Sequence, residues 1–257
     1  MYLIFVSILP VIILACYIYN KDKDKEPKKL LFKLFLGGVC STFLTLAITF
    51  VLGNFFPIIV TDTSQLDYFS LFIHVFFGIA LVEEFSKWFV LYMMSYNHSE
   101  FDQVFDLVVY SAFVALGFAC FENILYVLQN GMIIAIIRGL LAVPGHFFEG
   151  VFMGYYLSSA KVADISEDSS SKSWNMFLSL FVPILLHGFY DFCLLSGNIF
   201  FIGLFFIFMI ILYIKSFKKI KKMSLSDRKL KYNNKFCPNC GAPVTSDYCL
   251  GCGHRNE

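Results

Sequence analysis

The stretch IALVEEFSKWFVL (79–91) places two adjacent glutamates in the middle of an apolar run of roughly bilayer-spanning length. Lys87 follows Glu83 and Glu84 one turn later. Ionisable side chains at bilayer depth are rare because leaving water is costly for a charge, and they usually face a cavity or a partner. The stretch therefore predicts a membrane-spanning helix that carries a functional centre.

The composition of the whole chain supports a membrane protein. Of its 257 residues, 58% are hydrophobic and 19% aromatic, and the mean hydropathy of +0.70 excludes an ordinary soluble domain. Long apolar runs predict about seven transmembrane helices. These spans cover approximately residues 2–19, 30–56, 68–94, 104–128, 132–158, 175–196 and 198–214. The predicted fold class is all-α, a polytopic helical membrane protein with a small C-terminal zinc ribbon.

The placement of the charged residues predicts the orientation in the membrane. Most lysines lie in KDKDKEPKK (21–29), in the loop with Lys161 and Lys172, and in KSFKKIKK (215–222). The other connections, PIIVTDTSQLD, QNG and SGN, contain no Lys or Arg. The positive-inside rule then places the N-terminus outside and the C-terminus in the cytoplasm of a multi-pass cell-membrane protein. The net charge of +1 gives no reason to expect a nucleic-acid partner.

Four cysteines near the C-terminus form two C-x2-C pairs, CPNCG and CLGCG, each followed by glycine. This pattern predicts a four-thiolate zinc site with Cys237, Cys240, Cys249 and Cys252 as ligands, since disulfides are disfavoured on the cytoplasmic side. The predicted domains are a transmembrane domain (1–220), a basic linker (221–234) and the ribbon (235–257). The lysines before the ribbon would touch anionic lipid, and the ribbon would bind a cytoplasmic protein partner.

Polar residues within the spans form a set at similar depth. Counting along each span places them on four different helices near the middle of the bilayer or slightly nearer the outer face. They are Glu83 and Glu84 on the third span, Glu122 on the fourth, His146 on the fifth, and His187 and Asp191 on the sixth.

This set suits activation of water. A carboxylate in a low-dielectric site is a good proton acceptor near neutral pH, and imidazoles either bind a metal or donate to a developing oxyanion. Glu83 and Glu84 point about 100° apart on a helix, so we expect different roles for them, with Lys87 as counter-ion to one. Asp191 lies one turn after His187 and would orient its imidazole.

The same residues also fit a purely structural role. Glu83 with Lys87 would then be an ion pair that holds helices together. Arg138 is a candidate partner for Glu122, and Glu149 shares the helix face of His146.

Four segments in order, EEFSKWFVL, FDQVFDLVVYSAFVALGFACFENILY, IRGLLAVPGHFFEGVFMGYYL and LLHGFYDF, closely resemble the PrsW family of bacterial intramembrane proteases. A more distant resemblance is to the CAAX-protease and bacteriocin-processing superfamily. The resemblance covers about residues 1–220 and implies proteolysis of membrane-anchored protein substrates, of which an anti-sigma factor is the best-known type. By position it implies importance for Glu83, Glu84, Glu122, His146 and His187.

The metal content of the membrane site stays open at the level of sequence. The family is described as metalloproteases, yet the chain has no H-E-x-x-H motif, and related paired-glutamate enzymes can be interpreted as metal-free. We therefore expect an intramembrane endopeptidase with zinc in the ribbon and either a second divalent metal or glutamate chemistry in the membrane. The alternative is a non-catalytic membrane sensor or scaffold, in which the buried charges pair in dry packing and do not converge on a cavity.

Overall fold

The computed structural model describes residues 2–230 and Cys252, and this part of the chain is almost entirely helical. Its only strand-like contact is an isolated antiparallel bridge between Gln103 and Lys229. The predicted all-α fold class is confirmed. The helical segments are α1 (Tyr2–Lys21), α2 (Lys28–Phe55), η1 (Pro57–Val60), η2 (Thr63–Gln65), α3 (Tyr68–Ile73), η3 (His74–Ala80), α4 (Leu81–Ser95), α5 (Asp106–Asn130), α6 (Met132–Leu140), α7 (Ala142–Ile165), α8 (Ser169–Leu195) and α9 (Ile199–Leu225).

Seven helical stretches of the described part are long and apolar enough to cross a bilayer, which confirms the predicted number. Two of them are not continuous α-helices. The third consists of α3, the π-helical segment η3 and α4, and the N–H of Leu81 donates to the carbonyl of Phe76, five residues back. The fifth is interrupted at Leu141, where φ is −118° and ψ −58°, so α6 and α7 are separate helices.

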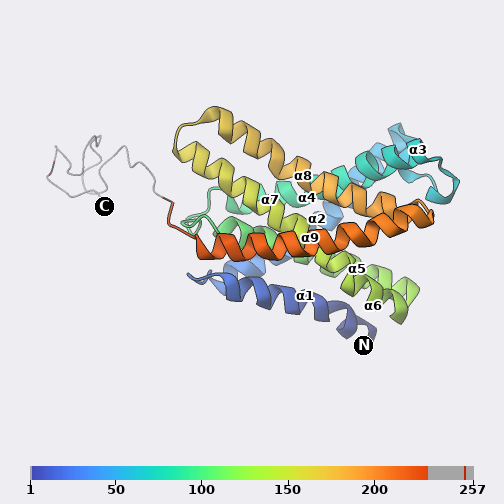
Figure 1. The fold of residues 1–257 in the computed structure, drawn as a ribbon, viewed down its shortest axis with the longest axis horizontal. Coiled ribbons are helices and arrows are strands. Elements are labelled where there is room, and N and C mark those ends of the chain that lie inside the picture. The colour runs from blue at the N-terminus through green and yellow to red at the C-terminus, as the bar shows by residue number, and fades with distance from the viewer. Residues whose placement is uncertain (1, 231–251, 253–257) are drawn as a thin grey trace.

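The helices run side by side, and their connections collect at two ends (Figure 1). The turn between α1 and α2, the turn between α7 and α8, and the C-terminal end of α9 lie at the left-hand end. The N-terminus, α3, α6 and the α8–α9 turn lie at the other. The lysine-bearing connections therefore share one end, as the seven-span interpretation requires.

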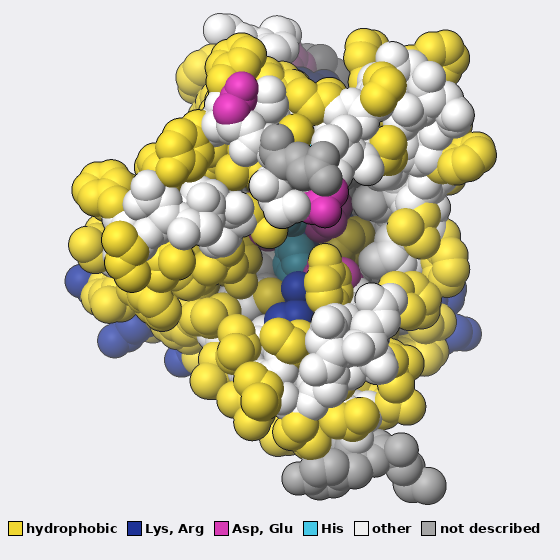
Figure 2. Space-filling model, turned by 90° about the vertical axis from the view of Figure 1, so that its right-hand side faces the viewer, with side chains coloured by type: hydrophobic (Ala, Val, Ile, Leu, Met, Phe, Trp, Pro, Cys, Tyr) yellow, Lys and Arg dark blue, Asp and Glu magenta, His cyan; other side chains and the backbone are white. Residues whose placement is uncertain are grey.

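The outer surface of the described helices is apolar. Large side chains such as Phe50, Phe69 and Ile199 are 75%, 75% and 83% exposed. Figure 2 shows hydrophobic side chains covering most of the visible surface of one end and its flanks. A surface of this kind is soluble in lipid and not in water, which supports membrane insertion.

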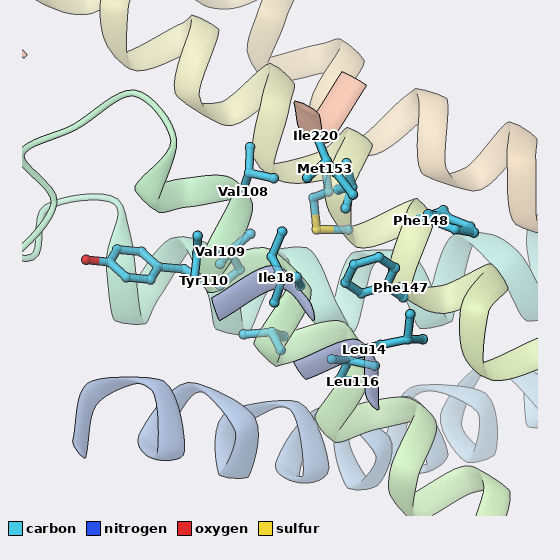
Figure 3. Packing of buried hydrophobic residues seen from close by; sticks show 14 of the residues in the cluster. Leu14, Ile18, Val108, Val109, Tyr110, Leu116, Phe147, Phe148, Met153 and Ile220 are labelled. Atoms are coloured by element: carbon cyan, nitrogen blue, oxygen red, sulfur yellow. The ribbon is translucent and has the colours of Figure 1, made fainter. Parts of the chain in front are cut away.

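The interior is a continuous apolar core between α1, α5, α7 and α9. Leu14 and Ile18 of α1 point towards Val109 and Leu116 of α5 (Figure 3). Phe148 of α7 lies on the other side of the core and stacks edge-to-face against rings of α9. This packing places α5 and α7 at the centre of the molecule.

Helices α2 and α5 approach so closely that two positions have room only for glycine. A Cβ atom on Gly38 would lie 1.9 Å from the carbonyl oxygen of Val114, and one on Gly117 would lie 2.0 Å from that of Phe35. Small residues allow such contact, which favours helix association in membranes. The contact fixes α5 against α2.

The residues after α9 are attached to the loop before α5. The N–H of Val104 donates to the carbonyl of Arg228 (3.1 Å), and the N–H of Phe105 donates to Oδ1 of Asp227 (3.0 Å). The predicted domain boundary at residue 220 falls inside α9. Of the predicted zinc ligands, Cys237, Cys240 and Cys249 lie outside the described residues, so the ribbon stays a prediction.

Candidate active site

A cavity of about 280 Å³ lies between α4, α5, α6, α7 and α8 and is lined by both polar and apolar side chains. Figure 2 looks onto the end opposite the lysine-bearing connections and shows a hollow with histidine, acidic and basic side chains in its depth. The predicted residues Glu83, Glu122, His146, His187 and Asp191 all line the cavity. The sixth, Glu84, lies directly behind it.

Helix α4 supplies the two adjacent glutamates, and they have different surroundings. The side chain of Glu84 is fully buried, and its Oε1 accepts from Nζ of Lys87 (2.6 Å). Glu83 lines the cavity with 13% of its side chain exposed, and its Oε2 lies 3.7 Å from Nζ of Lys87. Oε2 of Glu83 and Oε2 of Glu84 have no hydrogen-bond partner among the described residues. The expected difference between the two carboxylates is therefore present in the geometry.

The π-helical segment η3 comes directly before this pair. Each residue of an α-helix turns the chain by 100°, and a π-helical turn accommodates an additional residue. It therefore changes the direction in which all later side chains point. Such segments are frequent at functional sites.

His146 of α7 lies between two carboxylates and an ammonium group. Its Nε2 is 3.0 Å from Oε2 of Glu122, and its Nδ1 is 3.1 Å from Oε2 of Glu149. Nζ of Lys87 also lies 3.1 Å from Nδ1. One Nδ1 atom cannot both accept from Lys87 and donate to Glu149, so these two contacts belong to alternative protonation states of the imidazole.

His187 of α8 connects the buried side of the site with the cavity side. Its Nδ1 contacts Oε1 of Glu84 at 2.8 Å, whereas its Nε2 lies 3.3 Å from Oδ2 of Asp191 and 3.8 Å from Oε2 of Glu83. The centroids of the rings of His146 and His187 are 5.2 Å apart. The carboxylate of Glu84 therefore holds the His187 ring from behind, and Nε2 points towards Glu83 and Asp191.

Glu122 is fixed by α6. Nη2 of Arg138 contacts Oε2 of Glu122 at 2.6 Å, and Nε of Arg138 donates to Oδ1 of Asn123 (3.3 Å). Asn123 also donates to the backbone carbonyl of Ser7 (3.0 Å), which ties α1 to the site. The guanidinium lies 3.9 Å from the centroid of the Tyr126 ring. Arg138 forms part of the cavity wall through these contacts.

The charges and donor atoms of the site fit a divalent cation. Among the described residues, Lys87 and Arg138 are the only fixed cations that the site offers to five carboxylates, those of Glu83, Glu84, Glu122, Glu149 and Asp191. Such an excess of buried negative charge requires bound protons or a metal ion. One ligand atom from each of four side chains lies within 4.8 Å of the others, and the orphaned Oε2 atoms described above have free lone pairs. The four side chains are Glu84, His146, Glu149 and His187.

The structure also shows contacts that the sequence patterns did not give. Glu149 was expected only to share the face of His146, yet its Oε2 also lies 3.7 Å from Nδ1 of His187. Lys87 was expected to pair within its own helix, yet its Nζ also contacts His146 of a different helix, α7. The candidate pair of Arg138 with Glu122 is present. Within the described residues, all six predicted membrane-site residues belong to this one cluster.

A polytopic membrane protein whose buried carboxylates and imidazoles surround a cavity belongs, by fold and site, to the class of membrane proteins with a catalytic or ion-binding centre inside the membrane. The chain matches the model of the PrsW family of intramembrane metalloproteases over residues 26–215. It is 39% identical over 216 residues to Protease PrsW of Oceanobacillus iheyensis, covering 84% of this chain and 93% of the relative. It is 37% identical over 222 residues to Protease PrsW of Bacillus subtilis, covering 85% and 95%.

The chain therefore belongs to the PrsW family and is an intramembrane protease. No solved structure matches it. The family resemblance inferred from the four sequence segments is confirmed. The family model ends before the cysteine pairs, so the match carries no information about the zinc ribbon.

Proposed function

We propose that Glu83 activates the water that attacks the scissile peptide bond. The observation that carries this proposal is that Glu83 lines the cavity with 13% of its side chain exposed, while its buried Oε2 has no hydrogen-bond partner among the described residues and lies 3.8 Å from Nε2 of His187. A carboxylate acts as a general base only if it can reach a water molecule, and Glu84 is held away from the cavity by Lys87 and His187.

The proposed reaction uses the chain's own groups. Glu83 takes a proton from water while the oxygen attacks the carbonyl carbon of the peptide. The tetrahedral oxyanion is stabilised by donation from Nε2 of His187, which lies 3.3 Å from Oδ2 of Asp191. Glu83 then returns its proton to the leaving amine as the C–N bond breaks. Glu84 and Glu149 position the two imidazoles from behind.

A metal ion fits the same set of residues. Glu84, His146, Glu149 and His187 would hold it, and a bound divalent cation would polarise the carbonyl group or the attacking water. In that arrangement Glu83 stays on the cavity side as the proton acceptor. The proposed role of Glu83 is therefore the same whether or not the site binds a metal ion.

The matched variants Glu83→Gln and Glu84→Gln test this assignment. Glu83→Gln removes the base but no hydrogen bond of the described structure, so cleavage of a co-expressed membrane-anchored substrate should fall by about 10²–10⁴-fold while the melting temperature stays near that of the wild type. Glu84→Gln should lower the melting temperature because it leaves Lys87 without its closest partner. Cleavage by Glu83→Gln within tenfold of the wild type would exclude Glu83 as the base.

We propose a membrane-anchored protein as the substrate, with an anti-sigma factor as the family-based example. A carbonyl group inside a helix is already hydrogen-bonded, so the substrate must unwind locally before its peptide bond enters the cavity. Substrates with Gly or Pro near the cleavage site should therefore be cleaved faster than variants with Leu at those positions. A scaffold function is disfavoured because the charged residues, although several of them pair with each other, converge on one cavity.

We also propose that the lysine-bearing end is cytoplasmic and that the cavity opens towards the outer end. Cysteine labelling of Ser64→Cys and Ser170→Cys in a background without native cysteines tests this orientation. Residue 64 should react in intact cells and residue 170 should be protected. The opposite result would invert the orientation, and the proposed cytoplasmic zinc ribbon with its protein partner would then lose its basis.

A further inference from the structure

A second cavity, of about 330 Å³, lies at the lysine-bearing end and is lined by three cationic residues. Lys219 and Lys222 come from α9, and Arg228 comes from the segment after it. Tyr155 of α7 forms another wall, and Nζ of Lys219 lies 3.2 Å from the centroid of its ring. This basic pocket is separate from the cavity around Glu83, and no residue lines both.

No acidic side chain of the described residues lines the basic pocket. None of its three cations forms an ion pair with another described residue, although nearby basic residues do. Lys229 pairs with Asp102 at 3.6 Å, and Lys172 pairs with Asp164 at 2.8 Å. Three like charges around one cavity repel each other unless an anion binds between them.

The backbone that carries Arg228 is held in place. The carbonyl of Arg228 accepts from the N–H of Val104 (3.1 Å), and the N–H of Leu230 donates to the carbonyl of Asp102 (2.6 Å). On the α9 side, Oγ of Ser224 donates to the carbonyl of Lys21 (2.5 Å). Because these contacts fix the backbone around the pocket, little backbone ordering would be required on binding.

The depth of the pocket matches the headgroup region of a bilayer. Helix α9 has 27 residues and is thus roughly 40 Å long, which exceeds the hydrocarbon thickness of about 30 Å. Its last turns, with Lys219 and Lys222, therefore extend beyond the hydrocarbon at the end that the positive-inside rule places in the cytoplasm. Phosphate groups of anionic lipids are concentrated at this level.

We propose that the basic pocket formed by Tyr155, Lys219, Lys222 and Arg228 binds a phosphate-bearing group, with the headgroup of an anionic phospholipid as its source. The bound phosphate would link α7, α9 and the segment after α9. This proposal does not rest on the proposed roles of the glutamates and histidines.

The experiment uses the full chain purified in a non-ionic detergent. Phosphatidylglycerol, phosphatidylcholine or inorganic phosphate is added, and binding is followed by native mass spectrometry and by the melting temperature. We expect saturable binding of phosphatidylglycerol with a rise in melting temperature and no such effect of phosphatidylcholine. An equal effect of inorganic phosphate at similar concentration would keep the phosphate site but assign it to a free anion.

Two triple variants that remove the same charge distinguish the pocket from general surface attraction. Lys219→Ser/Lys222→Ser/Arg228→Ser should weaken binding of phosphatidylglycerol by roughly 100-fold, because each lost contact with the bound phosphate should cost a factor of about 5. The control Lys215→Ser/Lys218→Ser/Lys221→Ser alters the same helix outside the pocket and should weaken binding much less.

Equal weakening by both triples, or no saturable binding to the wild type, would overturn the proposal. The melting temperature without lipid serves as the folding control. If the pocket triple does not fold, the single variant Arg228→Ser, which lies outside α9, should still weaken binding by about 5-fold. Unchanged binding by that variant would also overturn the proposal.

Discussion

Replacing Lys87 with Met should destabilise the protein strongly, because the ammonium group is the closest cation to the fully buried carboxylate of Glu84. The side chains of Lys87 and Glu84 are 2% and 0% exposed, and the two groups are 2.6 Å apart. Removing one partner of a buried ion pair costs about 3–5 kcal/mol, since the other charge stays buried without compensation. At about 2–4 °C per kcal/mol for a protein of this size, the melting temperature should fall by roughly 6–20 °C.

The double variant Lys87→Met/Glu84→Gln provides the control for this prediction. Removing the charge of Glu84 as well should restore much of the lost stability, because the fully buried partner of Lys87 is then neutral too. Thermal unfolding in detergent would be measured for the wild type, both single variants and the double variant. A melting temperature of Lys87→Met within about 2 °C of the wild type, or a double variant less stable than Lys87→Met, would refute the reasoning.

Three further predictions concern other parts of the chain. Gly117→Ala should prevent correct packing of α2 on α5, because the new Cβ would lie 2.0 Å from a backbone carbonyl oxygen, whereas Gly203→Ala enters open space and should leave the yield of folded protein unchanged. Burial raises the pKa of Glu26 in the α1–α2 connection from 4.5 to about 7, so the folded state binds this proton more tightly than the unfolded state. The stability that this proton contributes should be full below pH 4.5 and lost as the pH rises through 7, and Glu26→Gln should flatten the pH dependence of the melting temperature. Elemental analysis should find zinc that is lost when Cys237 and Cys240 are both changed to Ser; zinc at full occupancy in that variant would place the metal outside the ribbon.

The sequence was sufficient for the helices and for the set of polar residues at similar depth. Apolar length predicts spans directly, and a charged residue within a span stands out against its surroundings. The interruption at Leu141 and the π-helical segment were not predicted, because neither changes the hydropathy of the segment. The run 132–158 is mostly apolar on both sides of Leu141, so hydropathy does not distinguish one bent span from two helices.

The pairing of side chains between helices was predicted less well than their depth. Lys87 was assigned to the glutamates of its own helix from i+3 and i+4 spacing, but its contact with His146 depends on the rotation of α4 relative to α7. Lipid-exposed and buried faces are both apolar in membrane helices, so the sequence pattern defines that rotation weakly. The role of Glu149 between two imidazoles could not be inferred for the same reason.

A change in the length of the π-helical segment η3 would rotate α3 relative to α4 without altering residues 83–87. Deleting one residue between His74 and Ala80 would restore α-helical spacing and rotate α3 relative to α4 by about 100°. Since Lys87 and His187 hold Glu84 in place, α4 would keep its position and the rotation would move α3 and the connection 56–67 before it. That connection is anchored by Nδ1 of His74, which contacts the carbonyl of Ile58 at 2.6 Å. Single-residue insertions and deletions in η3 would thus move α3 and this connection relative to the site while residues 83–87 stay unchanged.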